Sequence, residues 1–377
     1  MNVVLVWHGP ATARERDPLA RRQVPLLARL VAHGVSPRVV LLGDAGGLHL
    51  PIAEAGIRVD VLPVPLPPSV AALASLPRAV AGLRRVLAGC DADVLEGDEP
   101  MPAIALGLAA RRRTAPLFYR RHHDGGRLRL TVASRLAAHL ADRTVVSCEA
   151  MRRRAAAEDA VSPARVDVAV SGADDVAAPP PAVLAALRAG LGIPAEARVI
   201  VVVSRLRAEK GIDVLIRALP GLSDLAALHV VVVGDGPEEA ALRRLAAGAP
   251  VPVHFVGHRT DTAAWLALAT VVAIPSRRES FGRVTLEAMA AGRPLVASRA
   301  GGIVDAVTEG ETGLLVPPDD PPALAAALRS VLACDALAER LGAAARMRFQ
   351  ARHTIDHMAV AWRQAWVHAC RGGRRRR

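Results

Sequence analysis

The chain contains few cysteines and few aromatic residues, and both shortages narrow the candidate functions. Its 377 residues include four cysteines, and Phe, Trp and Tyr together make up 2%. Cys90, Cys148, Cys334 and Cys370 are far apart and match no Cys-x-x-Cys or zinc-ligand spacing, which argues against a disulfide framework and a metal site. We expect them to be reduced and mostly in the core. With so few aromatic side chains to stack on bases, nucleic acid is the weakest candidate partner, and we predict none.

Long apolar runs are also absent. No uninterrupted apolar stretch reaches the ~20 residues needed to span a bilayer. The opening residues 1–7 lack the basic segment and the cleavage site of a secretory signal. A cytoplasmic location is therefore the expectation.

Lysine is nearly absent, although the chain is strongly basic. Of the 48 lysine and arginine residues only one, Lys210, is a lysine, and the net charge is +12 at pH 7. This charge predicts an anionic partner, such as a membrane surface or a phosphorylated substrate. Lysine delivers a compact point charge where arginine presents a planar fork, and a phosphate-handling loop is one place where that difference matters. A single codon that escaped a compositional drift is the alternative.

The arrangement of apolar segments predicts an α/β fold with parallel sheets. Short β-branched runs alternate with Ala/Leu/Arg-rich stretches of helical period, as in doubly wound sheets. The predicted strands of the first half are 3–7, 38–42, 59–64, 93–95, 116–119, 144–147 and 166–170. Those of the second half are 198–203, 229–233, 253–256, 270–274 and 294–297.

The stretch 171–181, which ends in three prolines, is predicted to be a linker between two domains. We therefore predict an N-terminal Rossmann-like domain over 1–178 and a C-terminal one over 179–353. Residues 354–377 form a C-terminal helix, which could cross back to the first domain, and a basic tail. Ligands of open α/β sheets bind beyond the carboxyl ends of the strands, so the site is expected between the two halves.

Two glutamates follow the predicted strand 270–274. Glu279 lies in the loop after the strand, and Glu287 lies eight residues later, in a segment that becomes helical near Gly282. Both carboxylates can then face one ligand, while the amides of Phe281 to Val284 form a helix N-terminus that binds anions. This combination matches a nucleotide sugar, which carries hydroxyls on both sides of a diphosphate. A solvated pair of surface glutamates is the alternative.

The second half resembles the retaining GT-B glycosyltransferases of family 4, which carry this E-x7-E motif. The resemblance covers about residues 198–333. It rests on seven ordered segments: Ser204-Arg205 with Glu209 to Gly211, Val233 to Pro237, Phe255 to Gly257, Pro275-Ser276 with Glu279 to Gly282 and Glu287-Ala288, Gly292 to Ala297, Gly301-Gly302, and Gly310 to Val316. The resemblance implies a GT-B fold, in which two Rossmann-like domains face a central cleft.

The resemblance also implies roles for single residues. Arg205 and Lys210 would hold the donor diphosphate and stabilise the departing nucleotide. Glu279 would bind hydroxyls of the donor sugar, and Glu287 would hold the ribose. Further donor contacts would come from Phe281, Gly282, Arg283, Val284, Gly234 and Gly236. The family requires no metal, in agreement with the lack of an Asp-x-Asp motif beside the donor loop, so we predict no cofactor beyond the nucleotide-sugar co-substrate.

Gly234 and Gly236 have a competing interpretation as part of a dinucleotide-binding fingerprint. The third glycine of that motif is missing, because position 239 is Glu. We therefore predict a turn close to the nucleotide rather than an NAD site.

In the first half, the best candidate residues follow the predicted strand 116–119. His123 resembles the family histidine that reaches toward the donor sugar, His122 is the alternative, and a purely structural turn remains possible. The family usually has two glycines after its first strand. Here the segment contains only Gly9, followed by proline, which leaves the roles of His8 and Gly9 open.

Several arginines surround an apolar stripe near residue 130. The stripe consists of Val132, Leu136 and Leu140, and the arginines are Arg111 to Arg113, Arg120, Arg121, Arg127, Arg129 and Arg135. A basic amphipathic helix can lie on anionic lipid, which suggests peripheral membrane contact and a lipid-linked acceptor. Alternatively, the stripe packs on its own sheet and the arginines are solvated.

We predict a retaining glycosyltransferase that moves a sugar from a nucleoside diphosphate sugar to an acceptor hydroxyl by a metal-independent front-face mechanism. A nucleotide-sugar epimerase with a similar fold is one alternative, and it would consume the nucleotide sugar without an acceptor. A non-catalytic nucleotide-sugar-binding protein is the other, and it would bind nucleotide without turnover.

Overall fold

The computed structural model describes residues 1–8, 18–44, 48–66, 72–110, 115–122 and 128–373. The chain divides into two compact units. Unit 1 consists of residues 1–171 and 355–377, and unit 2 of residues 172–354. Unit 2 is therefore inserted, in sequence, into unit 1.

Unit 1 contains a seven-stranded parallel sheet in the order β3-β2-β1-β4-β5-β6-β7. Its strands are β1 (Asn2–His8), β2 (Ser36–Leu42), β3 (Arg58–Leu62), β4 (Val94–Asp98), β5 (Leu117–Arg120), β6 (Arg143–Val146) and β7 (Val166–Val168). The strand order reverses between β1 and β4, which are neighbours in the sheet. Such a reversal is a topological switch point, where ligands of open α/β sheets bind.

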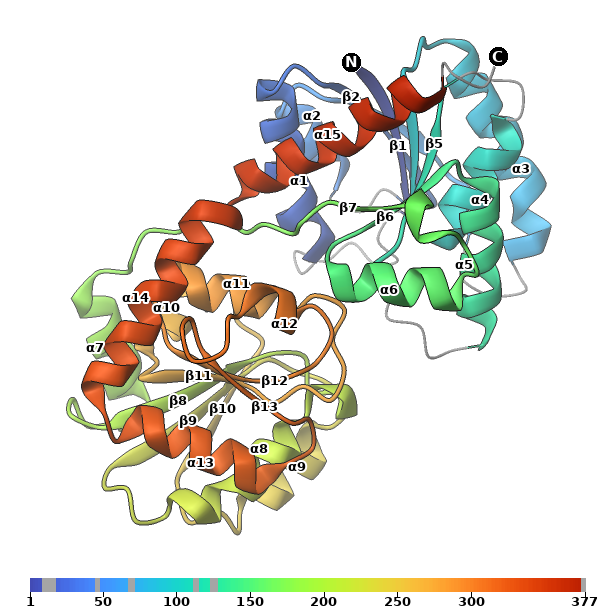
Figure 1. The fold of residues 1–377 in the computed structure, drawn as a ribbon. Helices are drawn as coiled ribbons and strands as arrows, with labels where there is room; N and C mark the ends of the chain where they lie inside the picture. The colour runs from blue at the N-terminus through green and yellow to red at the C-terminus, as the bar shows by residue number, and fades with distance from the viewer. Residues whose placement is uncertain (9–17, 45–47, 67–71, 111–114, 123–127, 374–377) are drawn as a thin grey trace. The chain divides into compact units, whose positions relative to one another are not determined.

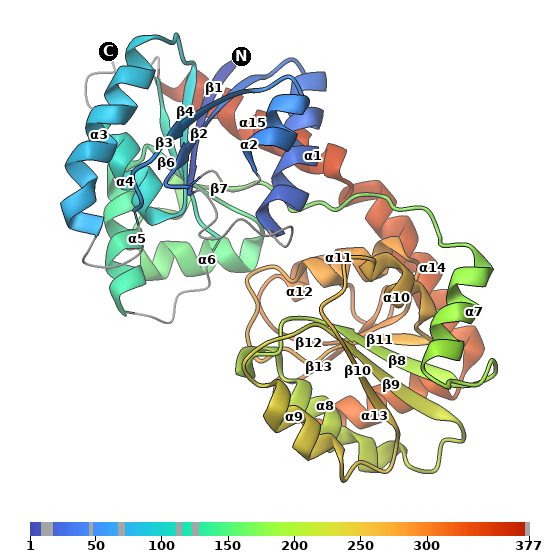
Figure 2. The same ribbon diagram turned by 180° about the vertical axis from the view of Figure 1, so that it is seen from behind.

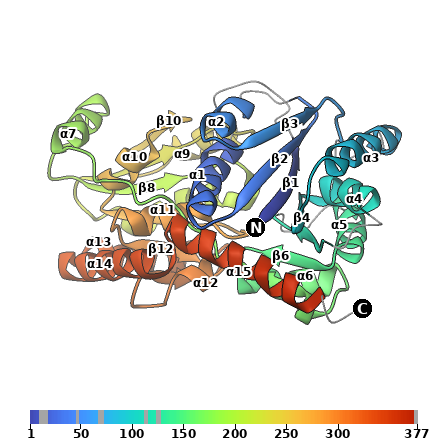
Figure 3. The ribbon, with the colours of Figure 1, turned by 90° about the horizontal axis from the view of Figure 1, so that it is seen from above.

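Helices cover both faces of this sheet (Figures 1 and 2). One face carries α1 (Pro18–Ala32), α2 (His49–Glu54) and α15 (Ile355–Gly373); the other carries α3 (Ala72–Ala88), α4 (Pro100–Ala109) and α5 (Leu128–Leu140). The helix α6 (Glu149–Glu158) contacts β6 and β7. Alternate residues of β1, namely Val3, Leu5 and Trp7, are buried in one cluster with Trp362 and Trp366 of α15. The last helix of the chain thus completes the core of unit 1 (Figure 3).

Unit 2 contains a six-stranded parallel sheet in the order β10-β9-β8-β11-β12-β13. Its strands are β8 (Arg198–Val203), β9 (Leu228–Val233), β10 (Val253–Gly257), β11 (Val271–Ile274), β12 (Leu295–Ser298) and β13 (Leu314–Val316). Here the order reverses between β8 and β11. Val199 to Val202 are almost fully buried, as expected for a central strand covered on both faces.

The helices of unit 2 also form two layers. One face is covered by α8 (Ile212–Ala218), α9 (Glu239–Ala246) and α13 (Pro321–Leu332), and the other by α10 (Thr262–Leu268), α11 (Arg283–Ala290) and α12 (Ile303–Ala306) (Figures 1 and 2). The unit also contains α7 (Pro181–Gly190), which contacts α10, and α14 (Asp335–Arg352), which contacts α11 and α13.

The two parallel sheets confirm the predicted fold class, and each predicted strand overlaps an observed one. One observed strand, the three-residue β13, was not predicted. Cys148 is buried, whereas Cys334 is exposed and Cys90 and Cys370 are intermediate, so the expectation of mostly core cysteines is wrong. Among the described residues no single helix has the length and apolar composition to cross a bilayer; α13 and α14 pass that test only as a pair bent by 98°.

Candidate functional site

The predicted donor residues Lys210 and Glu279 meet at the switch point of unit 2. Lys210 ends the short 3-10 helix η2 (Ala208–Lys210) after β8, and Glu279 lies in the loop after β11. The Lys210 Nζ atom is 2.5 Å from Glu279 Oε2. Ser276 donates its hydroxyl hydrogen to the same oxygen at 3.2 Å. The side chains are 23% and 11% exposed, so the ion pair is accessible to a ligand.

A second set of contacts holds these two loops together. The Arg277 amide donates to the Glu209 carbonyl at 2.9 Å, and the Arg277 guanidinium donates to the Ala208 carbonyl at 2.7 Å. The same guanidinium binds both carboxylate oxygens of Asp213 at 2.8 and 2.7 Å. Burial alone would raise the pKa of Asp213, but these hydrogen bonds outweigh it and hold the pKa below its ordinary value. These contacts therefore hold the loops that carry Lys210 and Glu279 in a fixed relation to each other.

Gly234 and Gly236 allow the turn after β9 to approach the β8 loop. Gly234 has φ 138°, and a Cβ atom there would lie 1.8 Å from the Ser204 carbonyl oxygen. A Cβ on Gly236 would lie 2.3 Å from the Leu206 carbonyl oxygen. Their glycine identity is thus explained by close packing within unit 2, without a dinucleotide. Whether they also contact a nucleotide stays a prediction.

The helix α11 begins beside this ion pair. Its N-cap, Gly282, adopts a left-handed conformation with φ 81°, which turns the chain from the loop into the helix. The Phe281 side chain is buried and anchors the turn, and the amides of Arg283 and Val284 belong to the first turn of the helix. Such amides attract anions. The predicted helix start near Gly282 is confirmed.

Glu287 lies one turn further along α11 and lines a pocket of about 340 Å³ within unit 2. The Arg283 Nη2 atom is 3.5 Å from Glu287 Oε1, so the polar end of the pocket carries both charges. The remaining lining is mostly small and apolar, including Ala263, Leu266 and Ala290, and the linker segment 176–179 also borders it. Further charged residues of the lining are Asp174, Arg293 and Arg346.

Arg205 is not joined to the Lys210–Glu279 pair. Its side chain is exposed and makes no hydrogen bond or ion pair with other residues that the structure describes. The structure thus brings two of the predicted donor residues, Lys210 and Glu279, together. Arg205 is an exposed cation on the same loop as Lys210.

Unit 1 has a different cluster at its own switch point. His8 ends β1, Asp98 ends β4, and His122 follows β5. The His122 Nε2 atom is 2.6 Å from Asp98 Oδ1, and Gln23 of α1 donates to Asp98 Oδ2 at 3.4 Å. Burial lowers the pKa of His8, although the nearby Asp98 opposes this effect. The net effect favours the neutral form of the His8 ring.

Asp98 and Gln23 were not predicted as site residues. The predicted strand 93–95 stopped short of Asp98, which the structure places at the carboxyl end of β4. A longer strand assignment would have shown an acidic residue at the edge of the sheet where ligands bind. Gly9 and His123, by contrast, lie outside the described residues, so their predicted roles stay predictions.

A buried charged cluster lies directly behind Asp98. Arg120 is 3% exposed, donates to Gln23 Oε1 at 3.0 Å and stacks on the Trp362 ring at 4.1 Å. Its Nη1 atom is 3.8 Å from the carboxylate of Glu96, which also accepts a hydrogen bond from Trp366 at 2.9 Å. Burial raises the pKa of Glu96 to about 7, although Arg120 opposes this effect.

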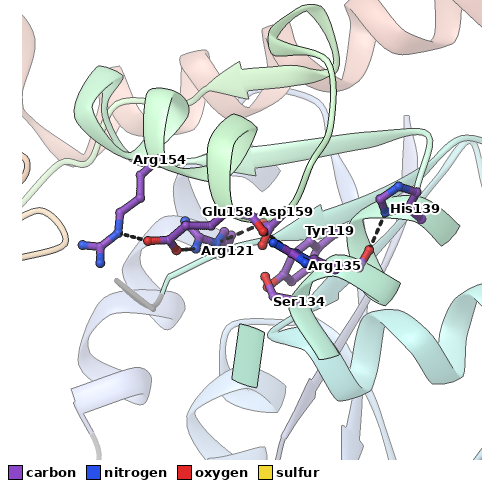
Figure 4. Close-up of polar contacts among 8 residues, drawn as sticks. All are labelled: Tyr119, Arg121, Ser134, Arg135, His139, Arg154, Glu158 and Asp159. Carbon is purple, nitrogen blue, oxygen red and sulfur yellow. Dashed lines mark hydrogen bonds and ion pairs between the residues drawn. The ribbon is translucent and has the colours of Figure 1, made fainter. Parts of the chain in front are cut away.

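The neighbouring Arg121 is buried as well and anchors the chain just before His122 (Figure 4). Its guanidinium lies 2.5 Å from Glu158 Oε2 and 3.1 Å from Asp159 Oδ2, both beside the end of α6. Glu158 also pairs with Arg154 at 2.5 Å. Both Arg120 and Arg121 thus belong to the interior of unit 1, and the expectation that they are solvated or face a membrane is wrong.

The helix α5 also differs from the expectation for its apolar stripe. Val132 and Leu136 are 61% and 50% exposed, while Ser134, Ala137 and Ala138 are buried. The Ser134 hydroxyl lies 3.0 Å from the Tyr119 hydroxyl of β5 (Figure 4). The helix therefore packs through small residues, whereas Val132 and Leu136 face outward and Leu140 lies close to Gly107 of α4. Arg111 to Arg113 and Arg127 lie outside the described residues.

The metal prediction stays untested. Over the described ranges, no three His, Cys, Asp or Glu side chains are grouped as metal ligands. The described residues form an accessible ion pair beside a helix N-terminus at the switch point of unit 2, and a histidine–carboxylate pair at that of unit 1.

Two family models match the chain. Residues 197–334 match the family described as "Glycosyl transferases group 1", and residues 19–172 match the "Glycosyl transferase 4-like domain". Among curated relatives, a D-inositol 3-phosphate glycosyltransferase of Nocardioides sp. is 35% identical over 54% of this chain and 49% of that protein. A glycogen synthase of Mycobacterium tuberculosis is 40% identical over 46% of this chain and 43% of that protein. The matches thus span about half the length of these relatives.

Solved structures resemble the whole chain more closely in fold than in sequence. HepE of Anabaena, crystallised with UDP and glucose, has a TM-score of 0.78 at 21% identity, over 96% of this chain and 98% of that one. A glycosyltransferase of Rickettsia africae has a TM-score of 0.81 at 16% identity, over 97% of both chains. At these identities the likeness concerns the fold, and it confirms the predicted pair of Rossmann-like units.

Proposed function

The chain belongs to the group 1 and family 4-like glycosyltransferases, and we propose that it transfers a sugar from a nucleoside diphosphate sugar to an acceptor hydroxyl. The observation that carries this proposal is the Lys210–Glu279 ion pair at the switch point of unit 2, beside the N-terminus of α11. A diphosphate and a sugar are the ligand parts that such a cation and such a carboxylate bind best.

In the proposed donor complex, Lys210 and Arg205 bind the diphosphate together with the first amides of α11. Phosphate competes with Glu279 for the Lys210 ammonium, so the Glu279 carboxylate becomes available to the hydroxyls of the donor sugar. The crystal structures of HepE with UDP and with UDP-glucose support this class of donor, because that protein shares the fold. The base and the sugar of this chain's donor stay open.

The pocket lined by Glu287 is the proposed nucleoside subsite. Its polar end offers the Glu287 carboxylate to the two ribose hydroxyls, as the family resemblance predicts. Its apolar part, with Ala263 and Leu266, offers a surface for the flat face of a base. The pocket volume of about 340 Å³ is within the range of small-ligand sites.

The proposed chemistry is front-face transfer with retention of configuration. The acceptor oxygen forms a bond to the anomeric carbon while the bond from that carbon to the phosphate oxygen breaks. The acceptor proton passes to the departing phosphate oxygen, so no nucleophile from the protein and no metal is needed. Lys210, Arg205 and the α11 amides stabilise the charge that grows on the leaving group, typically the largest catalytic contribution.

The test begins with ligand binding. In a thermal-shift screen of nucleoside diphosphates and nucleotide sugars, a ligand at ~100 times its Kd adds about 2.7 kcal/mol of apparent stability. With the donor found, Lys210→Ala should lower turnover about 10²- to 10³-fold. Arg198→Ala is the matched control, because Arg198 lies at the opposite end of β8 and pairs with Asp335 at 2.8 Å. Near-normal turnover by Lys210→Ala would contradict the proposal.

Product masses separate the alternatives in the same experiment. Transfer gives an acceptor heavier by one sugar residue plus free nucleoside diphosphate. An epimerase would alter the donor without an acceptor, and a binding protein would give a thermal shift with no product.

Peripheral membrane contact is a separate proposal that rests on α5. Val132 and Leu136 are exposed there, and the chain as a whole carries a net charge of +12. We expect co-sedimentation with vesicles containing anionic lipid at low salt, weakened by Leu136→Ser. Equal recovery in the supernatant with anionic and neutral vesicles would contradict it.

A further inference from the structure

A hydrogen bond between two histidine rings lies at the end of the unit 2 sheet opposite to the Lys210–Glu279 pair. His229 is the second residue of β9, and His254 is the second residue of the edge strand β10, so both lie at the amino ends of their strands. The His229 Nδ1 atom is 3.0 Å from His254 Nε2. The proposed sugar transfer uses neither ring.

The two rings point at each other through these nitrogens. Their centroids are 5.3 Å apart and their planes differ by 20°. Since the nitrogens are only 3.0 Å apart, they lie between the two centroids, and the hydrogen bond runs nearly along the line that joins the rings. In the neutral pair one nitrogen carries a hydrogen and the other accepts it. A second proton would place two N–H groups face to face.

Both histidines lie on one face of the sheet. His254 is opposite Val231 in the ladder between β9 and β10, two residues from His229, and alternate residues of a strand share a face. Val230 and Val232 are buried in the cluster formed with α8 and α13, so the histidines lie on the other face, which α10 covers. The ring pair therefore reinforces the ladder that holds the edge strand β10 on β9.

The surroundings of the pair disfavour positive charge. The sequence of α7 contains one charged residue, Arg188, and that of α10 contains none. On β8 the apolar Val199 is opposite His229, and the segment 248–252 before β10 has no charged residue. Burial and then Arg188 lower the pKa of His229, and burial and then His229 lower the pKa of His254.

We propose that the His229–His254 pair is a pH-sensitive clamp on the edge strand β10. At neutral pH the hydrogen bond between the rings holds the amino end of β10 on β9. When both rings are protonated, their N–H groups repel each other and the strand loosens. The carboxyl end of β10 is connected to the turn after β9, because the Gly257 carbonyl accepts a hydrogen bond from the Gly234 amide at 2.8 Å.

The lowered pKa values give the direction of the pH dependence. In the unfolded chain both rings have their ordinary pKa of 6.5, so between this value and the lower folded values the unfolded state binds more protons. The stabilisation by the pair is therefore fully present above about pH 6.5. It is lost as the pH falls through the lower pKa values of the folded state.

Hydrogen exchange measured by mass spectrometry on the whole protein tests the clamp. After correction for intrinsic rates, the amides of β10 should lose protection about tenfold between pH 7.5 and pH 5.0, while those of β8 stay protected. His254→Gln should abolish this loss, because a glutamine amide can donate to a neutral His229 ring and accept from a protonated one. Constant protection of β10 in the wild type, or an equal loss in His254→Gln, would overturn the proposal.

His258→Gln is the matched control, because it removes a histidine that directly follows β10 and leaves the pair intact. It should keep the wild-type loss of protection, and a loss abolished here as well would mean that the pH dependence does not arise from the pair. A titration of ¹⁵N-labelled histidines measures the coupling directly. His229 and His254 should take up their protons in two separate steps. A single common step for both rings would also overturn the proposal.

Discussion

The two units share one strand order around their switch points but place charge there in opposite ways. In unit 2 the Lys210–Glu279 pair lies in loops beyond the strands and stays 23% and 11% exposed. In unit 1 Glu96 and Arg120 lie within β4 and β5 and are 1% and 3% exposed. The same topology therefore presents an accessible cation for an anionic ligand in one unit. In unit 1 the two opposite charges lie together in the interior, and the partly exposed side chain at the sheet edge is a histidine.

This difference predicts that the two ion pairs contribute differently to stability. A buried cation whose removal leaves a carboxylate without compensation is costly to delete, whereas an accessible pair contributes little. Tryptophan fluorescence can follow the two units separately. Trp7, Trp362 and Trp366 belong to unit 1, so a Trp265→Phe background reports on unit 1 alone.

The largest expected effect is that of Arg120→Ala. It removes the Glu96 and Gln23 contacts and the stacking on Trp362, and should lower the free energy of unfolding of unit 1 by about 3–5 kcal/mol. Guanidinium unfolding in the Trp265→Phe background measures this value. A loss below about 1 kcal/mol would show that the buried cluster is not the structural counterpart of the accessible pair.

The second-largest expected effect is a pH dependence of stability that comes from the buried Glu96 of unit 1. Because burial raises the pKa of Glu96 from 4.5 to about 7, the folded state holds this proton more tightly than the unfolded state does. Its contribution to stability is fully present below about pH 4.5 and is lost as the pH rises through about 7. The total loss is about 3 kcal/mol.

Glu96→Gln should remove this titration. The stability of the variant relative to wild type should therefore increase between pH 5 and 8, with most of the change below pH 7, in the same fluorescence assay. Other titrating groups cancel in the difference. Parallel curves for the two proteins would contradict the raised pKa.

A smaller effect is expected where unit 2 relies on close backbone packing. Gly234→Ala would place a Cβ 1.8 Å from the Ser204 carbonyl oxygen and should cost unit 2 about 2 kcal/mol through strain and displacement of the loop. Gly192→Ala is the control, with φ 64° but nothing within 4 Å of the added atom, and should cost about 1 kcal/mol. An equal loss of stability in both variants would mean that the loop containing Ser204 moves aside without a cost in free energy.

The smallest stability effect is expected for Lys210→Ala, at about 1 kcal/mol or less, because its ion pair is partly solvated. Differential scanning calorimetry without ligand measures it, with Arg198→Ala as the control. The same variant should nevertheless lose most of its affinity for nucleoside diphosphate. A large stability loss without ligand would make Lys210 a structural residue like Arg120.

The sequence was sufficient to predict those features that depend on residues close together in the chain. Strand β8 was predicted with its exact bounds, because a run of buried β-branched residues needs no distant partner to be recognised. Lys210 and Glu279 were found through ordered motifs in adjacent loops. Their contact could be expected once both loops were assigned to the carboxyl edge of one sheet.

The sequence was insufficient where partners are far apart. Trp366 donates to Glu96 across 270 residues, and nothing near Arg120 or Arg121 in the chain shows that these arginines are buried. Composition favours solvated arginines, but tertiary partners from α1, α6 and α15 override it. Likewise β13 has three residues, too few for a periodic pattern, and is a strand only because it pairs with β12.

The position of α15 also has a consequence for biosynthesis. The helix supplies Trp362 and Trp366 to the core of unit 1, whose strands are all encoded before residue 171. During translation some 180 residues, those of unit 2, are therefore synthesised between the seven strands and α15. The core of unit 1 stays incomplete until α15 has left the ribosome. Unit 2 can complete its own core first, so the middle of the chain should become protease-resistant on the ribosome before its beginning does.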